Sequence, residues 1–134
     1  DKGERRVFNY GHTFGHAIEA LSDYEVSHGL AVTIGMDIAN YISLKNNIID
    51  EDTYLYFHKH LEKNLIPYYI GVDRIDDYCN LLMKDKKNTD NDIVCILPYG
   101  IKDLKITKIS ENNTDITIDK LKSDIINYME ERCL

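Results

Sequence analysis

The sequence is poor in cysteine and has no long apolar run, and both absences narrow the classes of protein to which it can belong. Its three cysteines, Cys79, Cys95 and Cys133, are odd in number and widely spaced, which excludes a disulfide framework and a zinc ribbon. No apolar stretch approaches the roughly 20 residues that cross a bilayer, and no secretory signal is visible. We therefore expect reduced thiols in a cytoplasmic protein.

Basic residues are in deficit, since 16 Lys and Arg stand against 23 Asp and Glu, a formal net charge of −7. Phosphate binding requires a basic face, so this balance excludes a general binder of nucleic acid or anionic membranes but leaves room for a local basic pocket. The 134 residues, 43% hydrophobic and 29% charged, are typical of one globular domain. The chain starts with Asp1 and enters a polar, glycine-containing motif at once, so we expect residues 1–134 to be one domain of a longer protein.

The spacing of apolar residues predicts a mainly α-helical domain with one small β-hairpin. Residues 28–45 give the strongest signal because they are apolar on nearly every face, which is typical of a buried helix. Asp50 and Asp73 are expected to cap the helices that follow them, and Pro98 is expected to end a short β-branched strand. The predicted helices are 9–21, 28–45, 51–64, 73–83 and 119–131, and the predicted strands are 93–97 and 104–109.

Three histidines are the strongest candidates for chemistry. His12 and His16 are four residues apart, so in a helix they share one face with backbones about 6 Å apart, a workable distance for chelation. Two antiparallel helices would bring His28 back to this pair. Each of the three is next to a glycine in the sequence, which indicates close approach of backbone or ligand, or tight helix packing. Spacing alone leaves two interpretations open, a metal site and histidines on a helix surface.

Other polar groups carry weaker signals. Arg5 and Asn9 offer donors to a carboxylate or phosphate, and the basic run Lys84–Lys87 could hold an anionic substrate if it lay beside a metal. Without such a neighbour, both groups are typical of a solvated surface. His58 and His60 are two residues apart and do not share a helix face, so we interpret them as surface residues.

Three stretches of the chain resemble the signature motifs of 3-dehydroquinate synthases, in the same order and at similar spacing. The first, RRVFNYGHTFGHAIE at residues 5–19, is long and highly specific. The second is HGLAVTIGM at residues 28–36, and the third is MKDKK at residues 83–87, followed by the predicted strand. The resemblance covers residues 1–101, and the last third of the chain carries no motif of its own.

This family comprises sugar-phosphate cyclases with an N-terminal α/β domain that binds NAD and a mostly helical C-terminal domain that holds much of the metal and substrate site. The resemblance implies that residues 1–134 are most of that helical C-terminal domain of a two-domain fold. No Gly-rich turn between a strand and a helix marks a dinucleotide-binding half in the sequence.

The activity that the resemblance implies is that of 3-dehydroquinate synthase, a phosphate-eliminating cyclase and carbon–oxygen lyase. It converts 3-deoxy-D-arabino-heptulosonate 7-phosphate to 3-dehydroquinate in the shikimate pathway, which leads to the aromatic amino acids. The implied cofactors are NAD and Zn²⁺, with Co²⁺ as the alternative metal.

Matched position by position, the resemblance assigns His12 and His28 as metal ligands, with a third ligand, a Glu, from an upstream segment outside this chain. It assigns His16 to substrate contact and proton transfer. Asp1 stands where the family usually has a Glu with an acid/base role, a conservative difference. The resemblance therefore pairs His12 with His28, whereas spacing pairs His12 with His16.

The resemblance assigns Arg5, Asn9 and Lys86 to substrate binding, and Lys87 remains an alternative to Lys86. Leu30 is a second difference, because the family usually has Glu directly after the His-Gly pair. Loss of that carboxylate would alter the surroundings of His28 and leaves the choice of substrate open.

Three alternatives remain at this stage. One is a sister cyclase that acts on another sugar phosphate, and another is an iron- or zinc-dependent polyol or alcohol dehydrogenase. The third is a helical metal-binding module with no activity of its own. We expect the partner to be a small sugar phosphate rather than nucleic acid or membrane. We also expect a homodimer of the full-length protein, and no turnover by residues 1–134 alone.

Overall fold

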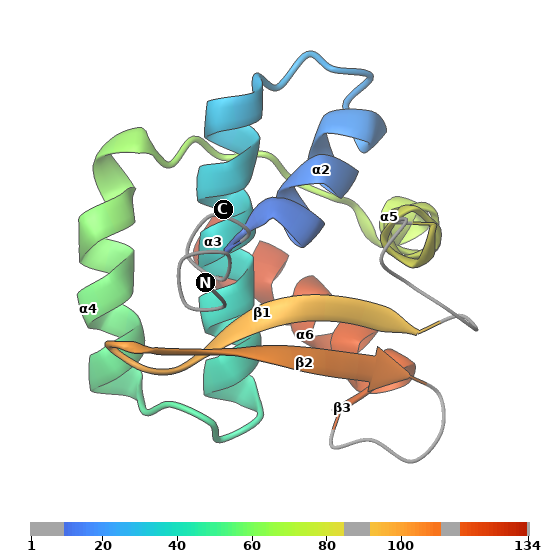
Figure 1. Ribbon diagram of the computed structural model, residues 1–134. Coiled ribbons are helices and arrows are strands. Elements are labelled where there is room, and N and C mark those ends of the chain that lie inside the picture. The colour runs from blue at the N-terminus through green and yellow to red at the C-terminus, as the bar shows by residue number, and fades with distance from the viewer. Residues whose placement is uncertain (1–9, 85–91, 111–115, 134) are drawn as a thin grey trace.

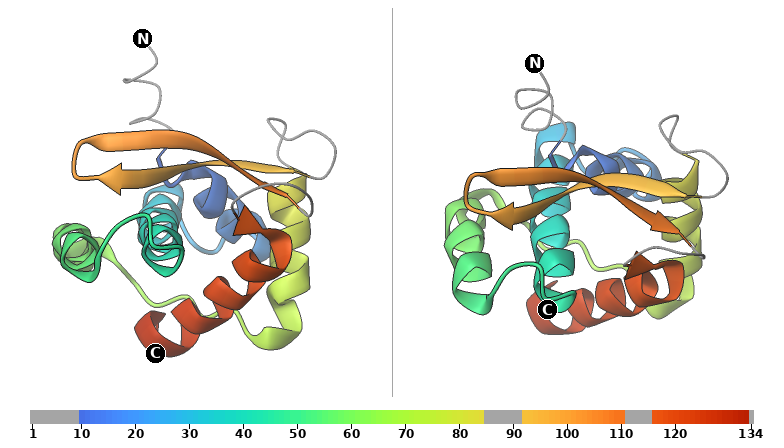
Figure 2. Two further views of the ribbon diagram at one scale, coloured as in Figure 1. Left: turned by 90° about the horizontal axis from the view of Figure 1, so that it is seen from below. Right: turned by 60° about the horizontal axis from the view of Figure 1, so that its bottom comes forward.

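The computed structural model describes residues 10–84, 92–110 and 116–133. Its longest helix, α3 (His28–Lys45), lies at the centre between α4 (Glu51–Leu61) on one side and α2 (His12–Leu21) with α5 (Ile75–Met83) on the other (Figure 1). A hairpin of β1 (Ile93–Gly100) and β2 (Asp103–Ser110) covers one face of α3, and α6 (Ile118–Tyr128) lies on the opposite face (Figure 2). The predicted mainly helical domain with a small hairpin is therefore confirmed.

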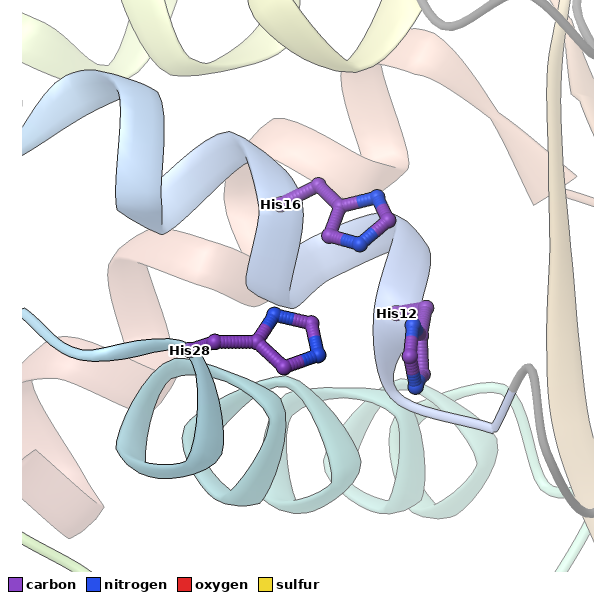
Figure 3. A group of neighbouring side chains, drawn as sticks. All are labelled: His12, His16 and His28. Carbon is purple, nitrogen blue, oxygen red and sulfur yellow. The ribbon is translucent and has the colours of Figure 1, made fainter. Parts of the chain in front are cut away.

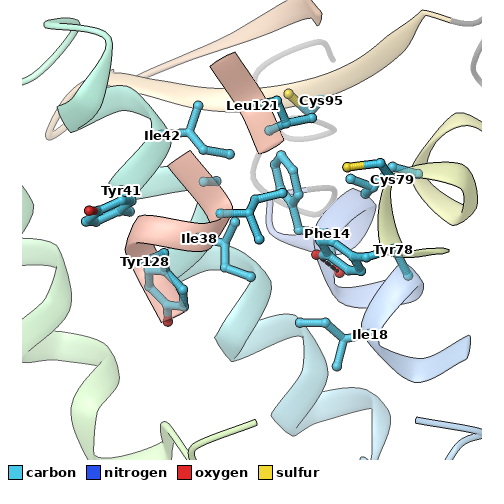
Figure 4. Close-up of a cluster of buried hydrophobic side chains, with 14 of the residues drawn as sticks. Phe14, Ile18, Ile38, Tyr41, Ile42, Tyr78, Cys79, Cys95, Leu121 and Tyr128 are labelled. Atoms are coloured by element: carbon cyan, nitrogen blue, oxygen red, sulfur yellow. Dashed lines mark hydrogen bonds between the residues drawn. The ribbon is translucent and has the colours of Figure 1, made fainter. Parts of the chain in front are cut away.

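The core forms around α3 because this helix is apolar on nearly every face, as the sequence predicts. Ile34, Ile38 and Ile42 of α3 are fully buried. Phe14 of α2 and Leu121 of α6 are buried in the same cluster (Figure 4). Each surrounding element contributes one apolar face, so the polar faces of α2 and α4 remain available for other contacts.

Glycines allow α2 to pack so closely on α3 that the main-chain atoms of the two helices are in contact. A Cβ atom at Gly35 would lie 2.1 Å from the carbonyl oxygen of Gly11, and a Cβ at Gly15 would lie 2.9 Å from that of Ala31. Gly11 also has a φ of 83°, in the left-handed region that favours glycine. The predicted close approach is confirmed for Gly11 and Gly15. At Gly29 neither a close backbone approach nor tight helix packing is found, because a Cβ there would meet nothing within 4 Å.

Several element ends differ from the sequence prediction. The strand expected to stop before Pro98 continues to Gly100, with Pro98 opposite Leu104. β1 is an edge strand of the three-stranded sheet, in the order β1-β2-β3, and an edge strand tolerates proline because only one side is paired. The short parallel strand β3 (Ile116–Thr117) was not predicted.

Of the two helix caps predicted from the sequence, one is confirmed and the other is wrong. Asp50 caps α4 as predicted, since its side chain accepts a hydrogen bond from the Thr53 N–H at 2.8 Å. Asp73 does not cap α5, because it lies within a short 3-10 turn and Arg74 occupies the cap position. The other helices begin or end within three residues of their predicted limits, with a 3-10 turn (Glu62–Asn64) after α4 and a π-helical turn (Met129–Cys133) after α6. No helix in the described ranges is long and apolar enough to cross a membrane.

Candidate metal centre

Three imidazoles gather where α2 meets the start of α3. His12 opens α2, His16 follows one turn later, and His28 is the first residue of α3 (Figure 3). The chain reverses between the helices in the short segment 22–27, where Asp23 and Tyr24 have left-handed backbones with φ of 55° and 63°. This reversal, together with the glycine contact between α2 and α3, places His28 beside the other two.

The local sequence of α2 explains why its histidines face outward. His12, His16 and Glu19 share one helix face, and Phe14 and Ile18 on the opposite face are buried. On that buried side, the hydroxyl of Tyr78 donates a hydrogen bond to the Phe14 carbonyl oxygen at 2.9 Å. The apolar face thus fixes the orientation of α2, and the polar face presents the imidazoles.

The geometry of the three rings suits a divalent transition metal. One ligand nitrogen from each of His12, His16 and His28 lies within 4.8 Å of the others. The ring centroids are 5.1 Å apart for His12 and His16, 5.2 Å for His12 and His28, and 5.6 Å for His16 and His28. Nitrogens bound to a tetrahedral Zn²⁺ are about 3.4 Å apart, so modest side-chain rotation would close the cluster. Imidazole donors favour zinc, cobalt, iron, copper or nickel over magnesium and calcium.

One carboxylate contacts the cluster from within α2. Oε2 of Glu19 lies 3.1 Å from Nδ1 of His28. Leu30, whose position raised the question of a missing carboxylate, is half-buried and packs against the core. The acidic neighbour of His28 therefore comes from the adjacent helix rather than from its own first turn.

The predicted juxtaposition of His12, His16 and His28 is confirmed. The other residues assigned by resemblance, Asp1, Arg5, Asn9, Lys86 and the alternative Lys87, lie outside the described residues.

A second histidine site was misjudged from the sequence. His58 is not a plain surface residue, because its Nδ1 lies 2.9 Å from Oδ1 of Asp37, a fully buried carboxylate on α3. His60 is exposed as predicted, and its Nδ1 lies 2.7 Å from the backbone oxygen of Tyr56. The signal that could have revealed this pair is the single carboxylate within the otherwise apolar centre of α3.

Two of the three cysteines lie in the core, away from any site. Cys79 and Cys95 are both buried free thiols. Burial raises the pKa of the Cys79 thiol to about 11 and that of the Cys95 thiol to about 12. Both therefore stay protonated near neutral pH and are poor nucleophiles.

The fold and the histidine cluster together define a helical domain with a candidate transition-metal centre. A family model described as 3-dehydroquinate synthase C-terminal matches residues 1–88. The chain belongs to this family of domains, which confirms the resemblance seen in its motifs.

Two curated relatives illustrate the match. A 3-dehydroquinate synthase of Sulfurimonas denitrificans is 37% identical over 115 residues, which cover 85% of this chain and 33% of the relative. A 3-dehydroquinate synthase of Helicobacter pylori (strain P12) is 43% identical over 99 residues, which cover 72% of this chain and 29% of the relative. The chain thus spans about a third of the length of the curated relatives that it matches.

A solved structure with the same fold is that of 2-deoxy-scyllo-inosose synthase complexed with carbaglucose-6-phosphate, NAD⁺ and Co²⁺. The TM-score is 0.67 and the sequence identity is 26%, with 89% of this chain and 34% of that chain covered. That structure contains carbaglucose-6-phosphate, and at this level of identity the likeness supports a shared fold rather than a choice of substrate.

Proposed function

We propose that this chain is the helical C-terminal part of a 3-dehydroquinate synthase that depends on NAD and a divalent metal. In this proposal the full-length enzyme converts 3-deoxy-D-arabino-heptulosonate 7-phosphate to 3-dehydroquinate and releases phosphate. The observation that carries it is the three-histidine cluster, because His12 and His16 come from the most specific sequence motif and His28 opens the second motif. The similarity to curated 3-dehydroquinate synthases supports the same choice.

His12 and His28 would hold Zn²⁺ or Co²⁺, completed by a carboxylate from an upstream segment. Their nitrogens fit this role because both rings face the centre of the cluster. A bound metal ion would polarise the oxygens of the substrate and favour their deprotonation. His16 borders the same space, with its ring centroid 5.1 Å from that of His12, so it is placed to accept or donate a proton at a substrate oxygen there.

The remaining assignments belong to the same proposal. Arg5, Asn9 and Lys86 (or Lys87) would bind the anionic groups of the sugar phosphate, and Asp1 would act as an acid or base. NAD would be bound mainly by an N-terminal domain, so residues 1–134 alone would not turn over. We place the full-length enzyme in the cytoplasm as a homodimer.

The test is an activity assay on the full-length protein supplied with Zn²⁺ and NAD. After addition of 3-deoxy-D-arabino-heptulosonate 7-phosphate, phosphate release and 3-dehydroquinate formation are followed. We expect product with the native protein and a loss of at least about 100-fold in His12→Ala and His28→Ala, since each variant removes a metal ligand. His60→Ala is the matched control, because His60 is an exposed histidine away from the cluster. A folded, metal-loaded protein that forms no product would refute the proposal.

A second candidate is a sister cyclase that acts on another sugar phosphate. The solved 2-deoxy-scyllo-inosose synthase favours it, because that structure contains a glucose 6-phosphate analogue and is similar over 89% of this chain. Glucose 6-phosphate in the same assay separates the two candidates, since only the sister activity would release phosphate from it.

A further inference from the structure

We propose that Glu19 is a positioning residue that fixes the tautomer and orientation of His28 for metal binding. This inference rests on the proposed function, in which His28 is a metal ligand. Its starting observation is the 3.1 Å contact between Oε2 of Glu19 and Nδ1 of His28.

The direction of this hydrogen bond follows from the chemistry of the two groups. An ionised carboxylate only accepts, so Nδ1 of His28 must carry the proton and donate it. A neutral imidazole that is protonated at Nδ1 has its free lone pair at Nε2. In Figure 3 the ring of His28 extends from the start of α3 toward His12. Glu19 therefore leaves the free lone pair on the side of the ring that faces the cluster.

The two partners differ in how firmly the fold holds them. The side chain of Glu19 is only 14% exposed, whereas that of His28 is 56% exposed. Glu19 also lies on the same helix face as His12 and His16, so one rigid helix carries all three groups. A well-packed acid can thus restrain an exposed ring that would otherwise rotate and exchange tautomers freely.

Stability alone does not account for the contact. A half-exposed hydrogen bond between a carboxylate and a neutral imidazole contributes little to the free energy of unfolding, because water competes for both groups. A carboxylate that accepts a hydrogen bond from a metal-bound imidazole has a larger effect on metal affinity. It raises the basicity of the imidazole and holds the ring in the orientation that binding requires. Loss of Glu19 should therefore weaken metal binding and leave the melting temperature nearly unchanged.

The experiment compares Glu19→Ala, Glu19→Gln and Glu25→Ala in the full-length protein. Glu25 is an exposed acid three residues before His28, so its removal controls for the loss of one negative charge near the cluster. The first readout is the tautomer of His28, measured by NMR on ¹⁵N-histidine-labelled, metal-free protein at about pH 8.5, where ordinary histidines are neutral. The second is the affinity for Zn²⁺, measured by competition with a chelator.

We expect His28 to be protonated at Nδ1 in the native protein and to become a mixture of tautomers in Glu19→Ala. The Zn²⁺ affinity should fall about 10- to 100-fold in Glu19→Ala and less in Glu19→Gln, whose amide oxygen can still accept the hydrogen bond from Nδ1 of His28. Glu25→Ala should match the native protein in both readouts. An unchanged tautomer or an unchanged affinity in Glu19→Ala would overturn the inference.

If the proposed function is wrong, the same measurements give a different result from the one that would refute the role of Glu19. In that case Zn²⁺ binding by the native protein would not depend on His12 and His28. The tautomer of His28 in metal-free protein would then decide the role of Glu19 by itself. A mixture in Glu19→Ala would support positioning, and an unaltered Nδ1 proton would refute it.

Discussion

Within the described residues, two carboxylate–histidine pairs have similar distances but very different surroundings. Glu19 and His28 are 3.1 Å apart beside two further imidazoles, and the ring of His28 is 56% exposed. Asp37 and His58 are 2.9 Å apart, and the carboxylate of Asp37 is fully buried. A carboxylate–histidine contact therefore occurs both beside an exposed cluster of imidazoles and against the core.

The difference lies in what else contacts the carboxylate. Asp37 also accepts hydrogen bonds from the hydroxyls of Tyr54 at 3.2 Å and Tyr128 at 2.7 Å. These donors come from α4 and α6, so one carboxylate of α3 joins three helices. Burial and the nearby Asp37 also raise the pKa of Tyr54 well above its ordinary value, which keeps this donor protonated. All three partners of the Asp37 carboxylate belong to the protein itself, so we interpret this pair as structural. The substitutions below test whether it differs in this way from the pair of Glu19 and His28.

The largest expected effect is that of Asp37→Ala. This substitution removes the shared acceptor of two hydroxyls and an imidazole, and we expect the free energy of unfolding to fall by about 3–5 kcal/mol. Urea denaturation followed by circular dichroism measures this change. Glu19→Ala is the comparison, and equal losses in the two variants would contradict the division into a structural pair and a positioning pair.

Gly35→Ala should have the next largest effect, and it acts on the cluster through the backbone. The new Cβ would lie 2.1 Å from the carbonyl oxygen of Gly11, so α2 must move away from α3. We expect a loss of about 1–3 kcal/mol in stability, together with weaker Zn²⁺ binding because His12 moves relative to His28. Gly29→Ala is the matched control, since its site is open and alanine is the better helix former. If both variants bind Zn²⁺ like the native protein, the contact between α2 and α3 does not determine the positions of the three imidazoles.

Tyr128→Phe sharpens the comparison within the core. It removes one of the three donors to Asp37 and keeps the ring, so we expect a loss of about 1 kcal/mol in the free energy of unfolding. Denaturation and Zn²⁺ titration on the same preparation would measure both properties. A change in Zn²⁺ affinity would mean that the two regions are coupled, contrary to our expectation.

Asp50→Ala should have the smallest effect, and the effect should depend on pH. The hydrogen bond from Thr53 lowers the pKa of Asp50 below its ordinary value. A lowered pKa in the folded state means that the cap stabilises the protein above the unfolded pKa of about 3.9 and loses this effect as the pH falls through the folded pKa. Melting curves should therefore separate native protein from variant at neutral pH and converge in strong acid. A gap that persists in acid would rule out this carboxylate as its source.

Local sequence patterns predicted most of the fold. The limits of α3 were predicted correctly because its apolar stretch is bounded by the polar segment before His28 and by two asparagines after Lys45. The histidine cluster was predictable because two of its members share a helix and the third starts the next one. Leu30 shows the limit of such reasoning, since the acid that contacts His28 lies nine residues upstream, at Glu19.

The features that sequence reasoning missed depend on partners far apart in the chain. Asp37 is buried because Tyr128, 91 positions away, folds back onto it. Gly35 matters because its neighbour is Gly11, at the N-cap of another helix. Hydrophobic periodicity describes one element at a time, so it detects neither contact.

The backbone contact between α2 and α3 has a consequence for how this protein can change over time. Main-chain atoms are common to all sequences, so the distance between α2 and α3 where they cross is set by the glycines rather than by the size of a side chain. Substitutions that conserve the volume and pattern of the surrounding core can accumulate by drift, whereas any side chain at Gly11, Gly15 or Gly35 would push the two helices apart. The most fragile positions of the site are therefore those that have no side chain at all.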